Sequence, residues 1–212
     1  MPREMLPLFP LGAVLLPGSR LPLHIFEDRY KEMIGAAIDG ESEFGIVLAK
    51  DEGIARVGCT AVVEEVVRRY PDGRMDIVAL GQSRFEIESL NQDKGYLRAE
   101  VKYFEDEPVA AEPPSRLIRQ ARRVFDRLRR AQPDREIPEP EDGSPTPSFQ
   151  FAQVIDDADF RQHLLVLRSE TDRLQHIVNH WPEYEAKRRL IARLREVAPS
   201  NGHGKWPRNF PE

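Results

Sequence analysis

With 212 residues, the chain can form one ordinary domain or two small ones, with a core large enough to fold without disulfides. Its net charge of −5 argues against nucleic acid as the main partner, because phosphate binding needs a basic surface. The single cysteine, Cys59, excludes an intrachain disulfide and indicates a reducing compartment. There is no signal-peptide pattern and no apolar run of about 18 residues, so we expect a cytoplasmic protein with no membrane partner.

The first 26 residues consist of short apolar runs separated by proline and glycine. The runs 6–11, 13–18 and 20–26 each have the length of a β-strand, and the prolines within them favour edge or terminal positions in a sheet. From 27 to 38 the apolar residues instead recur at helical spacing. This change predicts a short amphipathic helix that packs across the mouth of the sheet.

The next part of the chain has the alternation and the β-branched content of strands. The predicted strands are 43–49, 57–70, 75–80, 83–90 and 96–104. The sequence YPDGR at 70–74 predicts a tight turn, because Asp72 and Gly73 accept positive φ angles. We therefore expect an antiparallel meander that closes into a small barrel, since closure removes exposed strand edges. Cys59 lies in one of the alternating runs and is expected to be a buried thiol.

A change of composition at 105–114 separates this β-rich part from a helical part. The apolar spacing predicts a helix over 115–130, and five prolines predict a loop over 133–147. Separate, packed helices are predicted over 148–154, 159–167, 171–179 and 184–196. The predicted organisation is a β-rich subdomain over 1–108, a helical subdomain over 115–198 and a disordered tail over 199–212. This order of elements places the protein in the α+β class.

Two stretches of the β-rich part resemble a known family. The segment PLFPLGAVLLPGSRLPLHIFEDRYKEMI at 7–34 is similar to the start of the substrate-binding domain of the ATP-dependent protease Lon. In that family a proline-punctuated apolar entry, a P-G turn and a PL-x-IFE-x-RY segment follow in this order. The segment VGCTAVVEEVVRRYPDGRMDIVALGQSRFEI at 57–87 matches the same family's V-G-x-x-A strand, D-G turn and G-x-x-R-F-x-I strand. Together the two stretches cover about the first 105 residues.

The resemblance implies a PUA-like β pseudo-barrel with a crossing helix, followed by a small helical subdomain. It also implies a non-catalytic module that binds unfolded or extended polypeptides, with a separate ATPase or protease as a further partner. Resemblance and side-chain chemistry together suggest a peptide-binding set, which consists of Pro22, Leu23, His24, Phe26, Arg29 and Tyr30. The competing interpretation is that these residues fix the fold, and we give it the greater weight.

Motifs for nucleotide binding and for nucleophilic catalysis are missing from the sequence. There is no G-x-x-x-x-G-K-[ST] loop and no G-x-S-x-G elbow. None of the six lysines stands beside a serine in a pattern of the Lon protease site. We therefore expect no catalytic residues, no metal and no cofactor, because a family does not transmit an activity without its site.

The helix predicted over 115–130 contains seven arginines and one aspartate, which gives it a charge of +6. The alternative function is accordingly that of a PUA-like RNA-binding protein, with contacts from Arg116, Arg119, Arg122, Arg123, Arg127 and Arg130. The same pattern arises when a solvated helix pairs with acidic segments, here 105–112 and 134–142. We favour this internal charge balance, so nucleic acid is not the expected partner.

His176 and His180 have the i, i+4 spacing that places two imidazoles on one face of a helix, as in zinc proteases. The glutamate that acts as general base in those proteases is missing between them. Asn179 and Trp181 indicate the end of a helix here. We therefore interpret both histidines as solvent-exposed or stabilised by the helix C-terminus, not as metal ligands.

Overall fold

A computed structural model describes residues 5–108, 112–133, 135 and 137–197. Within them, one sheet contains β1 (Leu6–Leu11), β2 (Arg20–Ile25), β3 (Phe44–Lys50), β4 (Gly53–Arg69), β5 (Met75–Asn91) and β6 (Arg98–Tyr103). The helices are α1 (Asp28–Asp39), α2 (Ser115–Arg130), α3 (Pro147–Ala152), α4 (Ala158–Val166) and α5 (Glu170–Val197). The predicted α+β class is confirmed, and the predicted tail over 199–212 lies outside the described residues.

The sheet curls into a barrel with the strand order β2-β5-β4-β3-β1-β6, and a further pairing of β5 with β6 closes it. Strands β3 to β6 form the predicted antiparallel meander. β1 departs from it, because β1 runs parallel to β3 and pairs with β6 only at Leu6 and Pro7. In β1, Pro7 and Pro10 lie next to the two ends of the strand, which confirms the predicted terminal position. The predicted edge position does not apply to β1. It is confirmed for β2, which pairs with β5 alone.

Residues 75–80 and 83–90, predicted as two strands, form the single strand β5. Gly81 lies inside this strand, and a Cβ atom there would lie 2.3 Å from the carbonyl oxygen of Leu16. The glycine thus marks a close approach of a second segment, not the end of a strand. The predicted turn before β5 is confirmed, with Gly73 at φ 82°.

The segment 13–18, predicted as a strand, is a buried loop instead. The Ser19 N–H donates to the Leu16 carbonyl over 3.0 Å, and Gly18 has φ 70°. This turn brings the loop against Gly81 of β5. Its apolar side chains are explained by burial on the side of the barrel that faces the helices, and not by strand pairing.

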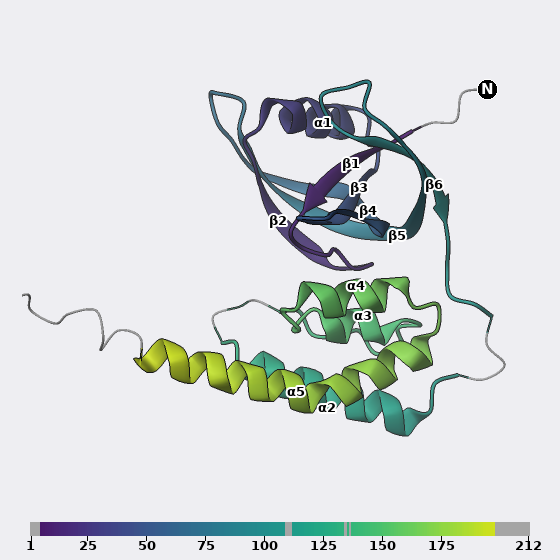
Figure 1. The fold of residues 1–212 in the computed structure, drawn as a ribbon, viewed down its shortest axis with the longest axis vertical. Coiled ribbons are helices and arrows are strands. Elements are labelled where there is room, and N and C mark those ends of the chain that lie inside the picture. The colour runs from purple at the N-terminus through teal and green to yellow at the C-terminus, as the bar shows by residue number, and fades with distance from the viewer. Residues whose placement is uncertain (1–4, 109–111, 134, 136, 198–212) are drawn as a thin grey trace, which may run out of the picture.

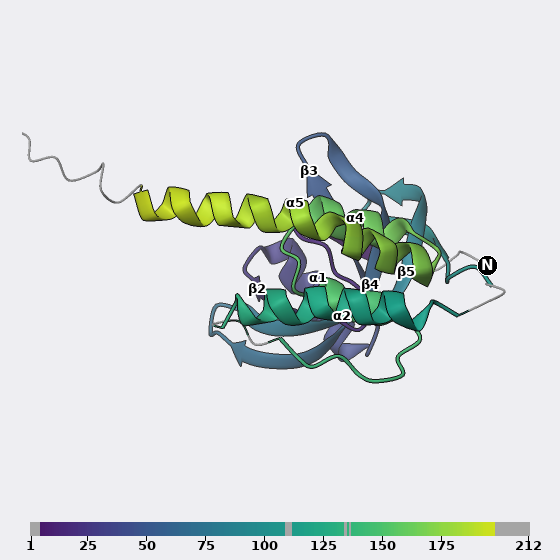
Figure 2. The same ribbon diagram turned by 90° about the horizontal axis from the view of Figure 1, so that it is seen from below.

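Helices α2 to α5 form a layer against one end of the barrel, and α1 covers the opposite end (Figure 1). Seen from below, α2 and α5 run side by side on the outer face of this layer (Figure 2). The crossing helix is confirmed, since α1 buries Tyr30, Met33, Ile34 and Ala37. One cluster of buried apolar residues continues from the barrel into the helical layer, so the two parts share a hydrophobic core.

The helices predicted over 171–179 and 184–196 are one continuous helix, α5, which runs through Pro182. Proline removes one backbone donor, and Pro182 lies at an exposed position of the helix. The prediction of two separate helices is therefore wrong. No helix among the described residues has the length and apolar character needed to cross a membrane.

Candidate functional site

An open seam lies between β1 and β2, where the barrel lacks strand pairing. β2 pairs with β5 on one side, and the last residues of β1 pair with β3 alone. A cavity of about 490 Å³ occupies the gap between them. We call it the seam groove; its lining consists of Phe9, Pro10, Leu11, Leu23, His24, Ile25, Phe26, Glu27, Arg29, Tyr30 and Leu97. The groove is therefore apolar, with charged side chains at the start of α1.

Five of the six residues predicted from the PL-x-IFE-x-RY segment line the seam groove, and Pro22 lies outside it. Their surroundings differ. Phe26 is 60% exposed, so its ring is held at the surface beside the groove. Tyr30 is buried and packs against Phe9 with ring centroids 4.3 Å apart, while Arg29 lies 4.6 Å above its ring. Burial raises the pKa of Tyr30. Tyr30 therefore supports the fold, and Phe26 is available for contact.

A polar cluster on the outer face of the barrel holds His24 beside Phe26. The His24 Nδ1 atom lies 2.6 Å from Asp76 Oδ1, and the Tyr70 hydroxyl donates to Asp76 Oδ2 over 2.8 Å. These hydrogen bonds, from His24 first and then Tyr70, lower the pKa of Asp76. The His24 ring stacks on Phe26 with centroids 6.0 Å apart. His24 is thereby fixed in orientation and supports the exposed ring.

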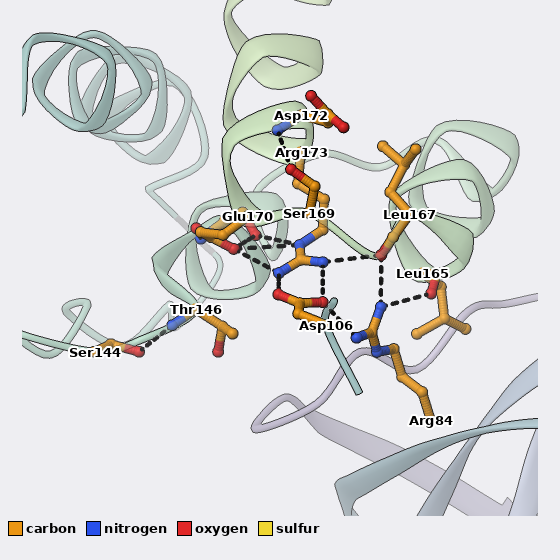
Figure 3. A network of polar contacts seen from close by, with 11 residues as sticks. Arg84, Asp106, Ser144, Thr146, Leu165, Leu167, Ser169, Glu170, Asp172 and Arg173 are labelled. Atoms are coloured by element: carbon orange, nitrogen blue, oxygen red, sulfur yellow. Dashed lines mark hydrogen bonds and ion pairs between the residues drawn. The ribbon is translucent and has the colours of Figure 1, made fainter. Parts of the chain in front are cut away.

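A second feature, missed by the sequence analysis, is a network of buried charges between the barrel and the helical layer (Figure 3). Arg173 of α5 has no exposed surface and forms ion pairs with Asp106 and Glu170. Its guanidinium also donates to the Leu167 carbonyl over 2.9 Å. Arg84 of β5 donates to the same carbonyl over 2.6 Å and to Asp106 over 2.5 Å. Asp106 lies in the segment that links the barrel to the helices, and its carboxylate forms ion pairs with one arginine from each part.

The two carboxylates of this network have opposite pKa shifts. Burial, the largest single effect, acts to raise the pKa of Asp106, but the hydrogen bonds and positive charges of Arg173 and Arg84 together outweigh it, so the pKa is lowered. Burial dominates at Glu170 and raises its pKa, although Ser148 and Arg173 donate hydrogen bonds to it. Each charge of this network has a partner within it, which indicates that the network holds the two parts together and leaves none of its members free for chemistry.

One sequence signal could have revealed part of this network. Gly81, Arg84 and Phe85 belong to the G-x-x-R-F pattern noted above. Gly81 admits the loop at Leu16, Arg84 reaches Asp106, and Phe85 is completely buried. The pattern therefore encodes the junction of barrel and helices. The partners of Arg84 could not be deduced, because they lie far away in sequence.

The arginines of α2 divide into two groups. Arg122 forms ion pairs with Asp126, Glu139 and Asp142, and Arg129 pairs with Glu139. The other five are exposed and have no ion pair with a described residue; they are Arg116, Arg119, Arg123, Arg127 and Arg130. Residues 109–111, 134 and 136 of the acidic segments lie outside the described residues. Among the described residues, internal ion pairs thus account for two of the seven arginines.

The two histidines considered as a metal pair have different surroundings. His176 is exposed, and its Nε2 atom lies 3.3 Å from that of His163 on α4. His180 is half-buried and stacks on Phe160 with ring centroids 4.1 Å apart. The sequence predicted a helix end near these histidines. This prediction is wrong, because α5 continues to Val197. Among the described residues, no three His, Cys, Asp or Glu side chains come together as metal ligands.

Cys59 has the surroundings predicted for it. Its side chain is completely buried inside the barrel, and burial raises the pKa of the thiol to about 12. A thiol with such a pKa carries almost no thiolate at neutral pH. Cys59 therefore serves as a small core residue, and not as a nucleophile.

Barrel, crossing helix and helical layer together define an α+β protein with a PUA-like β fold. The chain belongs to the family described as the ATP-dependent protease La (LON) substrate-binding domain, whose model matches residues 5–180. A Lon N-terminal domain protein from Xanthomonas campestris has a similar structure, with 26% identity and a TM-score of 0.65. The match covers 83% of this chain and 98% of that one. The N-terminal domain of a Mycobacterium avium complex Lon protease, 16% identical with a TM-score of 0.63, shares the fold over 83% of this chain and 97% of its own.

Sequence relatives include complete Lon proteases. That of Parabacteroides distasonis is 30% identical over 111 residues, or 49% of this chain. That of Roseiflexus castenholzii is 29% identical over 133 residues, or 59% of this chain. The matches span only 14% and 16% of the length of those proteins. The similarity is therefore to a small part of each protease.

Proposed function

We propose that this chain is a non-catalytic module that binds extended or unfolded polypeptides in the seam groove. The observation that carries the proposal is the exposed ring of Phe26 beside an apolar groove. An apolar side chain of this size at the surface is stabilised by binding an apolar partner, since contact removes its area from water. Membership of the substrate-binding family supports the same ligand class.

The backbone around the groove suits an extended ligand. β2 is paired on one side only, so its other side can add a strand of a bound polypeptide. Apolar side chains from both seam strands, among them Leu11 and Leu23, can then take up alternate side chains of that polypeptide. A separate ATPase or protease is the partner that would process what is bound, and a cytoplasmic location remains a prediction.

Binding of a fluorescently labelled, permanently unfolded protein tests the proposal. Phe26→Ser should weaken binding about tenfold or more, because the ring contributes its burial to the complex. Val67→Ser is the matched control, since Val67 is 58% exposed on β4 and lies outside the groove. Equal affinities of wild type and Phe26→Ser, or tight binding of a folded control protein, would contradict the proposal.

A second candidate function, RNA binding, is favoured by the exposed arginines of α2 that form no ion pair with a described residue. The exposed residues Arg116, Arg119, Arg123, Arg127 and Arg130 recur at intervals of three or four, so they lie on one helix face. From Arg116 to Arg130, a distance of fourteen helical steps, this face is about 21 Å long, which is enough to contact several phosphates of one strand. The acidic character of the whole chain weighs against this function.

Salt dependence separates the two candidates. If the α2 face binds RNA through phosphates, affinity for a labelled single strand should fall steeply with salt. Replacing Arg119 and Arg123 by Gln should then reduce the logarithmic salt slope by about 2. Weak binding that neither salt nor the double variant changes would exclude the RNA function, and would leave polypeptide binding unaffected.

A further inference from the structure

A further cavity, of about 690 Å³, lies between β2 and the helical layer. We call it the arginine pocket, because its polar lining is Ser19, Arg20, Arg135, Gln153 and Arg161. Among the described lining residues there are three arginines and no acidic residue. The rest of the lining is apolar and includes Leu21, Pro22 and Ile137. The pocket thus combines positive charge with apolar walls.

Arg161 of α4 is the central group of this pocket. Its Nε atom is buried and has no hydrogen-bond partner, and no described carboxylate forms an ion pair with it. Burial, followed by the charge of Arg135, lowers the pKa of Arg161 to about 10. The charge of Asp156 acts to raise this pKa, although Asp156 is exposed and forms no ion pair with Arg161. Arg161 is partly buried, and a buried donor without a partner is costly, so an anion that enters the pocket gains a strong partner.

Two further polar groups of the pocket differ in whether their hydrogen bonds are satisfied. Ser19 is 2% exposed, and its hydroxyl oxygen is buried without a hydrogen-bond partner. Arg20 is different, because it donates to both carboxylate oxygens of Glu64. Arg20 is therefore already satisfied, and the unsatisfied donors are those of Arg161 and Ser19. Buried polar groups without partners are rare in folded proteins and call for an explanation.

We propose that the arginine pocket binds a carboxylate attached to an apolar group, as at the chain end of a polypeptide with an apolar last residue. A guanidinium fork matches the two oxygens of a carboxylate. The apolar walls accept the side chain attached to the carboxylate. A doubly charged phosphate fits less well, because its second charge would lie against these apolar walls. The identification of this carboxylate as the end of a polypeptide chain rests on the proposed polypeptide-binding function.

The strand β2 connects this pocket with the seam groove. Leu21 and Pro22 line the pocket, and residues 23–25 of the same strand line the groove. Pro22 and Phe26 are four residues apart, about 13 Å in an extended strand. A polypeptide bound along β2 in the groove would therefore have its end within reach of the pocket. This arrangement also gives a role to Pro22, the one predicted contact residue outside the groove.

Small ligands test the pocket independently of polypeptide binding. N-acetyl-leucine and N-acetyl-leucinamide differ only in the carboxylate, and their dissociation constants can be compared by NMR titration. We expect wild type to bind the acid at least about tenfold more tightly than the amide. Arg161→Met should abolish this preference, whereas Arg119→Met, which removes an exposed arginine outside the pocket, should retain it. Thermal unfolding of both variants confirms that they are folded.

Equal binding of acid and amide by wild type, or an unchanged preference in Arg161→Met, would overturn the proposal. Three labelled peptides then identify the source of the carboxylate: one with a free apolar C-terminus, its amide, and the amide with one internal Glu. Preference for the free end supports chain-end recognition, and equal binding of the Glu peptide assigns the pocket to acidic side chains. If acetyl-leucine binds through Arg161 but no polypeptide binds, the proposed function fails and the carboxylate site stands.

Discussion

The barrel and the helical layer satisfy their buried polar groups in different ways. In the barrel, Thr60 is completely buried, and its hydroxyl exchanges hydrogen bonds with the backbone of Ser83 on the neighbouring strand. In the helical layer, Arg173 and Glu170 are buried as ions, and a third charge comes from Asp106 of the linker. A neutral local contact tolerates the loss of a partner better than a buried ion does. The attachment of the helices is therefore more vulnerable to single substitutions than the barrel.

The largest expected effect is at Arg173. Arg173→Met leaves the buried Glu170 and the partly buried Asp106 without their main partner, which should lower the free energy of unfolding by about 3–5 kcal/mol. Urea denaturation measures this change. Arg56→Met is the control, since Arg56 forms an exposed ion pair with Glu86 and should change stability by less than about 0.5 kcal/mol. A loss below about 1 kcal/mol for Arg173→Met would remove the contrast between the two parts.

In the barrel, the position most sensitive to substitution is expected where the loop at Leu16 lies close to Gly81. Gly81→Ala places a methyl group against the Leu16 carbonyl and should lower the free energy of unfolding by about 1–3 kcal/mol. Gly12→Ala is a matched control, because a Cβ atom there would meet nothing within 4 Å apart from its chain neighbours. Thermal denaturation of both variants makes the comparison. If the two substitutions had equal effects, the close approach of loop and strand would not matter for stability.

A smaller effect is expected where α5 holds the segment before α4. The Tyr184 hydroxyl accepts a hydrogen bond from the Asp156 backbone N–H over 2.8 Å. Tyr184→Phe removes the acceptor and keeps the buried ring, so the free energy of unfolding should fall by about 1 kcal/mol. Hydrogen exchange of the Asp156 amide should also accelerate. Unchanged exchange would mean that this contact contributes nothing to the attachment of the helices.

The smallest effect concerns pH and the contact of α4 with α5. Burial, and then the neighbouring His176, lower the pKa of His163 in the folded protein. The unfolded chain therefore binds the proton first as pH falls, and stability should decrease through and below the ordinary histidine range. His163→Gln should reduce this decrease between about pH 7.5 and pH 5.5, measured by urea denaturation at each pH. An identical pH profile for both proteins would show that His163 does not contribute.

The sequence predicted the barrel better than the helical layer, and particular residues explain why. Strand alternation and the turn around Gly73 are local signals, so the meander of β3 to β6 could be recognised. The predicted breaks between strands 75–80 and 83–90 and between helices 171–179 and 184–196 contain Gly81 and Pro182, residues whose usual local effect is to interrupt an element. In the structure, Gly81 admits a crossing loop and Pro182 lies on an exposed face. Both exceptions depend on neighbours that local patterns do not contain.

The candidate sites divide in the same way. The sequence by itself determined the family resemblance, the apolar segment around Phe26 and the charge of α2, because composition and spacing express them directly. Only the tertiary structure decided that β1 and β2 leave a seam, that Arg173 and Arg84 share Asp106, and that the Nε atom of Arg161 is buried without a partner among the described residues. Such facts depend on contacts between residues far apart in the chain, and desolvation and Coulomb energies are set by those contacts.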